Sequence, residues 1–119
     1  MEERKQRLIL EPRGDVTIVS FLDKKILDEV HIQEIGEELF EAIEKKGKTK
    51  MLLNFENVDY LSSAALGKLI TLNKRLKEEN GHLKLCNIKE NIYEVFRITK
   101  LNKIFEIYDS EEAALAKFK

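Results

Sequence analysis

The sequence has little of the chemistry that builds metal sites and disulfides: one cysteine and two histidines among 119 residues. Cys86 has no second cysteine with which to form an internal disulfide, which favours a reducing cytoplasm as the compartment. A structural zinc site needs several cysteine or histidine ligands at short spacing, and neither His31 nor His82 has such a neighbour. We therefore expect a cytoplasmic protein with no metal and no cofactor.

Long apolar runs and an excess of either charge are also absent. No apolar run approaches the roughly 20 residues that cross a bilayer. No apolar signal-peptide segment follows the charged start at Met1–Lys5. The 21 Lys and Arg residues nearly balance the 22 Asp and Glu residues, which leaves a net charge of −1. Because binding to phosphate backbones normally requires a basic excess, we expect neither nucleic-acid binding nor membrane insertion.

Motifs for phosphate-binding loops and for serine hydrolases are missing as well. Neither G-x-x-x-x-G-K-[ST] nor G-x-G-x-x-G occurs, and no G-x-S-x-G elbow surrounds a serine. The glutamates of the first helical segment recur at the spacing of a solvated helix face rather than of a paired-carboxylate site. These glutamates are Glu37, Glu38, Glu41 and Glu44. We therefore expect a protein that is not an enzyme.

What the chain does contain is an alternation of β-rich and helix-periodic segments. Pro12–Asp15 predicts a turn between two β-rich runs, which gives an N-terminal hairpin. Apolar residues recur at helical spacing in two long segments, and one asparagine shares the second stripe. The first stripe is Ile32, Ile35, Leu39, Phe40 and Ile43, and the second is Leu66, Leu69, Ile70, Asn73 and Leu76. The expected strands are 8–10, 16–22, 51–55, 82–86 and 104–108. The expected helices pass through 32–43, run from about 63 to 80, lie near 88–96, and begin at Asp109 with Glu112 in a capping box.

These elements predict an α/β fold with a mixed sheet. Strands separated by helices imply parallel pairing with right-handed crossovers, and the N-terminal hairpin adds an antiparallel pair. At this length folding buries roughly two-thirds of the surface, enough for one core. We expect a single domain over residues 1–119, with its core at about 8–118, about five strands and about four helices.

The most informative local feature is the pair Ser62–Ser63, which opens the second predicted helix. Backbone N–H groups at a helix start lack intrahelical partners and carry partial positive charge. A serine there can cap the helix through its hydroxyl. It can also carry a phosphate whose charge the helix end tolerates. The residues alone leave both interpretations open.

Four stretches carry a family resemblance. Leu53–Val58 is similar to a strand followed by a short turn, and Tyr60–Gly67 to a central aromatic-apolar-Asp-Ser-Ser/Ala-Gly-Leu-Gly motif. Gly81–Asn87 is similar to a Gly-x-Leu-x-Leu strand, and Leu101–Ala113 to a closing strand and helix start. In this order they resemble the STAS domain, the sulphate-transporter and anti-sigma-factor-antagonist module, in its stand-alone bacterial form. The resemblance covers about residues 8–118.

This resemblance implies the STAS fold and the function of an anti-sigma-factor antagonist. In antagonists of the family, the serine after the Asp is phosphorylated by a partner kinase that is also the anti-sigma factor. Ser63 is the matching residue here. Ser62 stands where the family has Asp, and Ala65 where it has Gly. The resemblance thus implies a module that binds a GHKL-type anti-sigma kinase, frees a sigma factor, and is switched off by phosphorylation of Ser63.

The implied partner surface surrounds that serine. The kinase would bind the ATP, a PP2C-type phosphatase is a further implied partner, and we expect a monomer or weak dimer. Two alternatives stay open: a structural STAS module in a signalling scaffold or membrane-associated lipid-handling complex, whose Ser63 only caps a helix, and a small serine-dependent enzyme. The residues expected to contact the partner are Asp59, Tyr60, Ser62, Ser63, Ala64, Gly67, Lys68 and Thr71.

Overall fold

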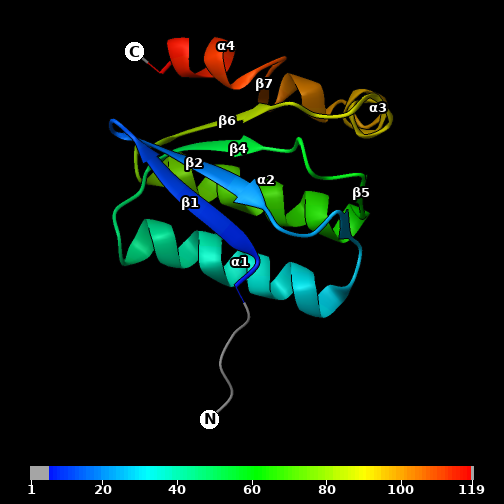
Figure 1. The fold of residues 1–119 in the computed structure, drawn as a ribbon, viewed down its shortest axis with the longest axis horizontal. Coiled ribbons are helices and arrows are strands. Elements are labelled where there is room, and N and C mark those ends of the chain that lie inside the picture. The colour runs from blue at the N-terminus through cyan, green and yellow to red at the C-terminus, as the bar shows by residue number, and fades with distance from the viewer. Residues whose placement is uncertain (1–5, 119) are drawn as a thin grey trace.

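A five-stranded mixed sheet is the centre of the computed structural model, which describes residues 6–118 (Figure 1). The strand order is β1-β2-β4-β6-β7, and a separate two-stranded sheet pairs β3 with β5. The strands are β1 (Leu8–Arg13), β2 (Val16–Phe21), β3 (Lys25–Ile26), β4 (Lys50–Asn54), β5 (Tyr60–Leu61), β6 (His82–Cys86) and β7 (Glu106–Tyr108). The helices are α1 (Glu29–Glu44), α2 (Ser63–Glu78), α3 (Glu90–Ile98), the short 3-10 helix η1 (Leu101–Lys103) and α4 (Glu111–Ala116).

The N-terminal hairpin is confirmed, with a tighter turn than expected. β1 pairs antiparallel with β2, and Arg13 faces Val16. The turn is therefore Gly14–Asp15, where Gly14 has a φ of +64°, a conformation that glycine adopts without strain. Pro12 was predicted in the turn but lies in β1. It is tolerated there because β1 is an edge strand, where a missing N–H breaks no central ladder.

The rest of the sheet is parallel, as the alternation of elements predicts. β2, β4, β6 and β7 run in the same direction. α1 and α2 cover one face of the sheet and α4 covers the other (Figure 1). The larger core lies between the sheet and α1 and α2, with Leu53 and Leu85 fully buried. A smaller cluster under α4 contains Ile18, Leu52 and Cys86. The predicted α/β class, with a mixed sheet, is thus confirmed.

Cys86 is a buried residue of the smaller cluster and forms no disulfide. Burial raises the pKa of its thiol to about 12, and the nearby carboxylates of Glu111 and Glu56 act in the same direction. The thiol therefore stays protonated at neutral pH and packs as a small apolar group. This agrees with the packing role expected from its place in an apolar strand.

The apolar stripes of the two long helices are confirmed with one correction. In α1, four of the five predicted residues are buried, and Phe40 is half-buried against the same core. In α2, Ile70 is 39% exposed, whereas Leu72 is fully buried. Ile70 was placed on the stripe by spacing alone. The contact with α1 fixes the actual rotation of α2, which buries Leu72 instead of Ile70 and keeps Asn73 buried as predicted.

The C-terminal segment also begins slightly differently from expectation. β7 begins at Glu106, because η1 occupies residues just before it. Ser110 is the N-cap of α4, and its hydroxyl accepts a hydrogen bond from the Ala113 N–H at 3.1 Å. Asp109 was predicted as this cap and lies one residue too early. Serine and aspartate are equally good N-caps, so the sequence Asp109–Ser110 alone does not show which of the two begins the helix.

Candidate functional site

The two adjacent serines occupy different positions at the start of α2. Ser62 is the N-cap, with extended backbone, and its hydroxyl accepts a hydrogen bond from the Ala65 N–H at 3.2 Å. Ser63 is the first helical residue and is exposed. Within residues 6–118, the Ser63 hydroxyl has no hydrogen-bond partner. The expectation that Ser63 caps the helix in the structural-module alternative is therefore wrong, because Ser62 already fills that position. The rest of that alternative stays open.

This division of roles predicts different costs for two similar substitutions. Ser62→Ala removes the cap acceptor and is expected to lower the free energy of unfolding by ~1 kcal/mol. Ser63→Ala removes a hydroxyl that contacts no described group, so we expect a change within about 0.5 kcal/mol. Urea denaturation followed by circular dichroism measures both. Equal losses for the two variants would contradict the assignment of the cap.

A small parallel sheet holds the segment that leads into these serines. The N–H groups of Asp59 and Tyr60 both donate to the carbonyl of Lys24, at 2.7 and 3.2 Å. The Ser62 N–H donates to the carbonyl of Ile26 at 3.1 Å. The β3–β5 pair thus fixes the direction from which the chain enters α2. The sequence did not predict this pair, because strands of two residues have no detectable periodicity.

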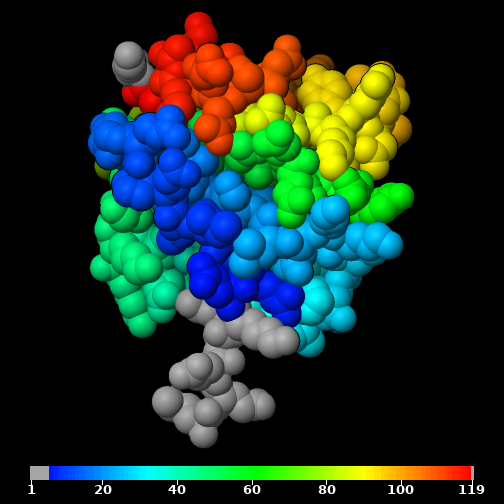
Figure 2. All heavy atoms as spheres, in the orientation of Figure 1, coloured from blue at the N-terminus to red at the C-terminus, as the bar shows by residue number. Residues whose placement is uncertain are grey.

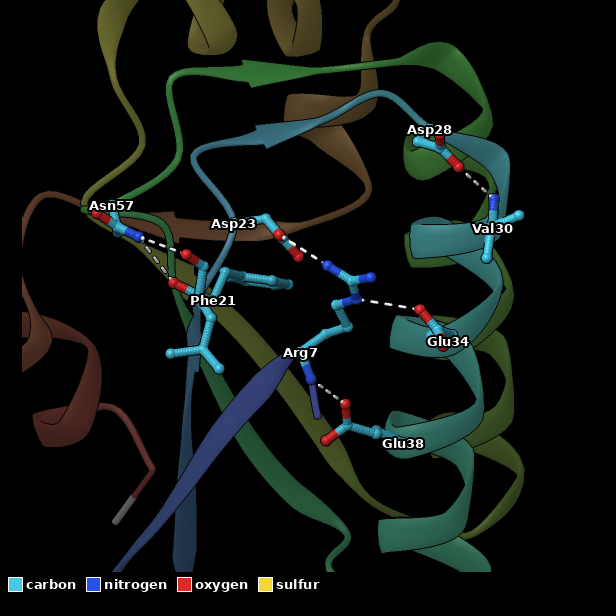
Figure 3. Close-up of polar contacts among 9 residues, drawn as sticks. Arg7, Phe21, Asp23, Asp28, Val30, Glu34, Glu38 and Asn57 are labelled. Carbon is cyan, nitrogen blue, oxygen red and sulfur yellow. Dashed lines mark hydrogen bonds and ion pairs between the residues drawn. The ribbon is translucent and has the colours of Figure 1, made fainter. Parts of the chain in front are cut away.

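A charged cluster anchors the loop before β3 to α1 (Figure 3). The guanidinium of Arg7 donates to Asp23 at 3.1 Å and to Glu34 at 3.0 Å, and all three side chains are largely buried. The Arg7 backbone N–H donates to the carboxylate of Glu38. Glu38 and Glu41 are half-buried rather than fully solvated as expected, whereas Glu37 and Glu44 are exposed.

Asn57 ties the other side of the same loop in place. Its amide donates to the carbonyls of Phe21 and Leu22 at 3.0 and 3.3 Å (Figure 3). Phe21 ends β2, and Asn57 lies in the connection from β4 to β5. The segments before β3 and before β5 are thereby linked to each other. The surface beside Ser63 thus rests on four parts of the chain: the residues at the start of β1, the connection from β2 to β3, α1, and the connection from β4 to β5.

Asp59 lies at the edge of this surface and is paired with α3. Its carboxylate accepts a hydrogen bond from the Lys89 ammonium, and its carbonyl accepts one from the Asn91 amide at 3.0 Å. The hydrogen bond from Lys89 is the main cause that lowers the pKa of Asp59. Desolvation opposes it, and attraction from Lys89, Lys24 and Lys25 lowers the pKa further. Asp59 therefore stays ionised at neutral pH and joins α3 to β5.

A pH prediction follows from this depressed pKa. Since the pKa of Asp59 is lower in the folded protein than its ordinary value of 3.8, the pair stabilises the fold above that value. The contribution is lost as the pH falls through the lower folded-state pKa. We expect Lys89→Met to raise the pKa of Asp59 toward 3.8. An NMR titration of the Asp59 carboxyl carbon measures this, and an unchanged midpoint in the variant would contradict it.

The other residues expected at the partner surface fall into two groups. Tyr60, Ala64, Gly67 and Thr71 are exposed, and Tyr60 is 51% accessible. Ala64, Gly67 and Thr71 follow Ser63 along one face of α2 at helical spacing. The Thr71 hydroxyl donates to the Gly67 carbonyl at 3.0 Å.

Lys68 was expected to be an exposed position of α2 but is not, so only its contact with the partner stays a prediction. It is half-buried, and its side chain lies across the contact between α2 and α1. A methyl group on Gly36 of α1 would come within 3.3 Å of the Lys68 Cδ atom. Glycine at position 36 thus makes room for the aliphatic part of the lysine, which covers the core with its stem.

Neither a metal centre nor a membrane span emerges from the described part of the chain. Residues 6–118 contain no group of three or more His, Cys, Asp or Glu side chains placed to hold a metal ion. None of the helices over the same residues combines the length and the apolar character needed to cross a bilayer. What the residues around Ser63 offer chemically is an exposed hydroxyl on a partly charged surface.

Comparison with known proteins points to one family. A family model for the STAS domain matches residues 7–114. A protein named as a candidate anti-sigma factor antagonist, BtrV of Bordetella bronchiseptica, is 33% identical over 79% of this chain and 80% of its own. The anti-sigma F factor antagonist of Paenibacillus polymyxa is 26% identical over 97% of this chain and 89% of its own.

Solved structures share the fold at lower identity. A candidate anti-sigma factor antagonist of Thermotoga maritima superposes with a TM-score of 0.82 at 24% identity, covering 92% of both chains. The phosphorylated form of the Bacillus cell fate determinant SpoIIAA superposes with a TM-score of 0.72 at 19% identity, covering 94% of this chain and 99% of its own. The family match over nearly the whole chain and the 33% identical relative lead to one conclusion: this chain belongs to the STAS domain family.

Proposed function

We propose that this chain is an anti-sigma factor antagonist, a protein-binding module that captures an anti-sigma kinase and thereby frees a sigma factor. The names of its relatives support the class of function. The observation that carries the switch is the exposed Ser63 hydroxyl, which has no partner within residues 6–118, beside a neighbour that already caps the helix. In this proposal the module acts in the cytoplasm, catalyses nothing, and leaves ATP binding to the kinase.

Phosphorylation of Ser63 would change the surface without refolding it. A phosphoserine carries a charge of about −1.5 to −2 at neutral pH. At the first position of α2 it faces the unpaired N–H groups and the positive end of the helix dipole, which favour it by roughly 0.3–2 kcal/mol. The helix start therefore tolerates the phosphate. A partner surface that fits a neutral hydroxyl does not, because it would have to desolvate and oppose a new charge.

The serine at position 62 is compatible with this role. Aspartate and serine are both strong N-caps, so Ser62 can replace the family's Asp without losing the start of α2. The structure shows this cap in place, with the Ser62 hydroxyl bound to the Ala65 N–H. The replacement removes one negative charge beside the acceptor. We infer that it changes which kinase recognises the site rather than the geometry of the acceptor.

One experiment tests the switch directly. Purified chain is incubated with ATP and each GHKL-type anti-sigma kinase of its source organism, and the phosphate is located by mass spectrometry. We expect one phosphate on Ser63, retained in Ser62→Ala and lost in Ser63→Ala. Phosphate on Ser62, or none in the presence of a kinase that binds the chain, would contradict the proposal. The second result would leave the structural module as the explanation.

A further inference from the structure

A shallow apolar groove lies next to the switch serine. It has a volume of about 160 Å³ and is bounded by β5, the first turn of α2 and α3. Leu27, Tyr60 and Val95 line it and are 53%, 51% and 38% exposed, although all three are large apolar or aromatic residues. Leu61 and Leu66 line the same groove. In Figure 2 the light-blue, green and yellow segments that carry these residues adjoin on one side of the molecule.

The end of the groove beside Tyr60 is basic. Lys24, Lys25 and Lys89 all lie close enough to attract the carboxylate of Asp59. Asp59 is bound to Lys89. Lys24 and Lys25 are exposed and form no ion pair with any residue from 6 to 118. The ammonium of Lys25 lies 5.7 Å from the centre of the Tyr60 ring, at the mouth of the groove.

This combination of an apolar floor and a basic end restricts the occupant. A second copy of the chain in a two-fold dimer would bring the same patch against itself, and the two sets of lysines would then face each other. Such like-charge contacts disfavour association. A partner whose apolar side chain is flanked by carboxylates instead satisfies both features, since it fills the groove and pairs with the free lysines.

We propose that the groove binds an acidic segment of the partner protein, with one large apolar side chain seated between Tyr60, Leu66 and Val95 and carboxylates facing Lys24 and Lys25. This proposal rests on the proposed function, since it describes the partner of the same surface. It also explains why phosphorylation would weaken partner binding. A phosphate on Ser63 repels an acidic partner and competes with it for the lysines.

The test uses the isotope-labelled full chain and three synthetic hexapeptides, EELFEE, KKLFKK and EESGEE, in NMR titrations. EELFEE is expected to shift the amides of residues 60–66 and 91–95 and to bind at least tenfold more tightly than the other two. Val95→Asp and Lys25→Glu are each expected to weaken EELFEE at least fivefold. Matched controls are Ile9→Asp on the exposed edge of β1 and Lys46→Glu after α1, which should change binding less than twofold.

Several results would overturn the proposal. These are equal binding of EELFEE and KKLFKK, shifts confined to another face, or equal binding by the groove variants and the wild type. Shifts of the groove amides on dilution of the protein alone would assign the groove to self-association instead. Because the titration uses no kinase, a missing phosphate on Ser63 leaves its result unaffected, and the two proposals fail separately.

Discussion

Ser63→Asp is expected to lower the affinity of this chain for its anti-sigma kinase at least a hundredfold, which corresponds to about 2.7 kcal/mol. The variant places a permanent negative charge on an exposed position. In the proposed complex the partner contacts this position as a neutral hydroxyl. Like charges forced together across an interface cost several kcal/mol, because each one also loses its hydration. Isothermal titration calorimetry with the purified kinase measures the change.

Ser62→Asp is the matched control for this prediction. It adds the same charge one residue earlier, at the N-cap, where aspartate replaces serine without loss of the cap. Ser62 is also half-buried, whereas Ser63 is exposed. We expect Ser62→Asp to bind within about threefold of the wild type and to fold normally, while Ser63→Asn keeps most of the affinity because it is neutral. Equal losses for the two aspartate variants would show that the response is to charge anywhere at this helix start.

Phe55→Ala is expected to destabilise the fold by about 3–5 kcal/mol, the usual cost of removing a buried aromatic ring. Phe55 is fully buried directly after β4, and its ring centre lies 4.9 Å from that of Phe21. Its backbone also joins two elements, since its N–H donates to the Cys86 carbonyl at 3.0 Å and its carbonyl accepts from the Val58 N–H at 2.9 Å. Urea denaturation should show a lower midpoint with an unchanged slope.

Phe40→Ala provides the comparison for Phe55→Ala. Phe40 is a phenylalanine on α1 that packs against the same core but is only half-buried. Its truncation leaves a space that water can reach, so the cavity cost is smaller. We expect less than half of the loss measured for Phe55→Ala. Equal losses would mean that packing at the end of β4 is no more important than packing at the helix surface.

The layout of the fold could be predicted from the sequence because its signals are local. Ile32, Ile35, Leu39 and Ile43 recur with the period of a helix, and the continuous apolar run of β4 is typical of a strand buried on both faces. Gly14 marks the hairpin turn. These features depend on neighbours in the chain, and the sheet order then follows from short right-handed connections.

The details of the site could not be predicted in the same way, since they depend on tertiary contacts. The pairing of β3 with β5 involves two residues from each strand and carries no periodic signal. The two candidate caps of α2, Ser62 and Ser63, are one residue apart, and the start of a helix is usually uncertain by that much. Lys68 looked exposed because only the packing of α1, with glycine at position 36, brings it into the helix contact.

The two outer strands of the five-stranded sheet bear on whether the chain aggregates at high concentration. β7 is three residues long, and β1 carries Pro12, which has no N–H to offer, between the charged residues Glu11 and Arg13. Long, flat, apolar edges recruit further strands and lead to aggregates, and neither outer strand is of that kind. An antagonist that works by stoichiometric capture must match the abundance of its target. The blunted edges of the sheet remove one route to aggregation as the concentration of the chain rises.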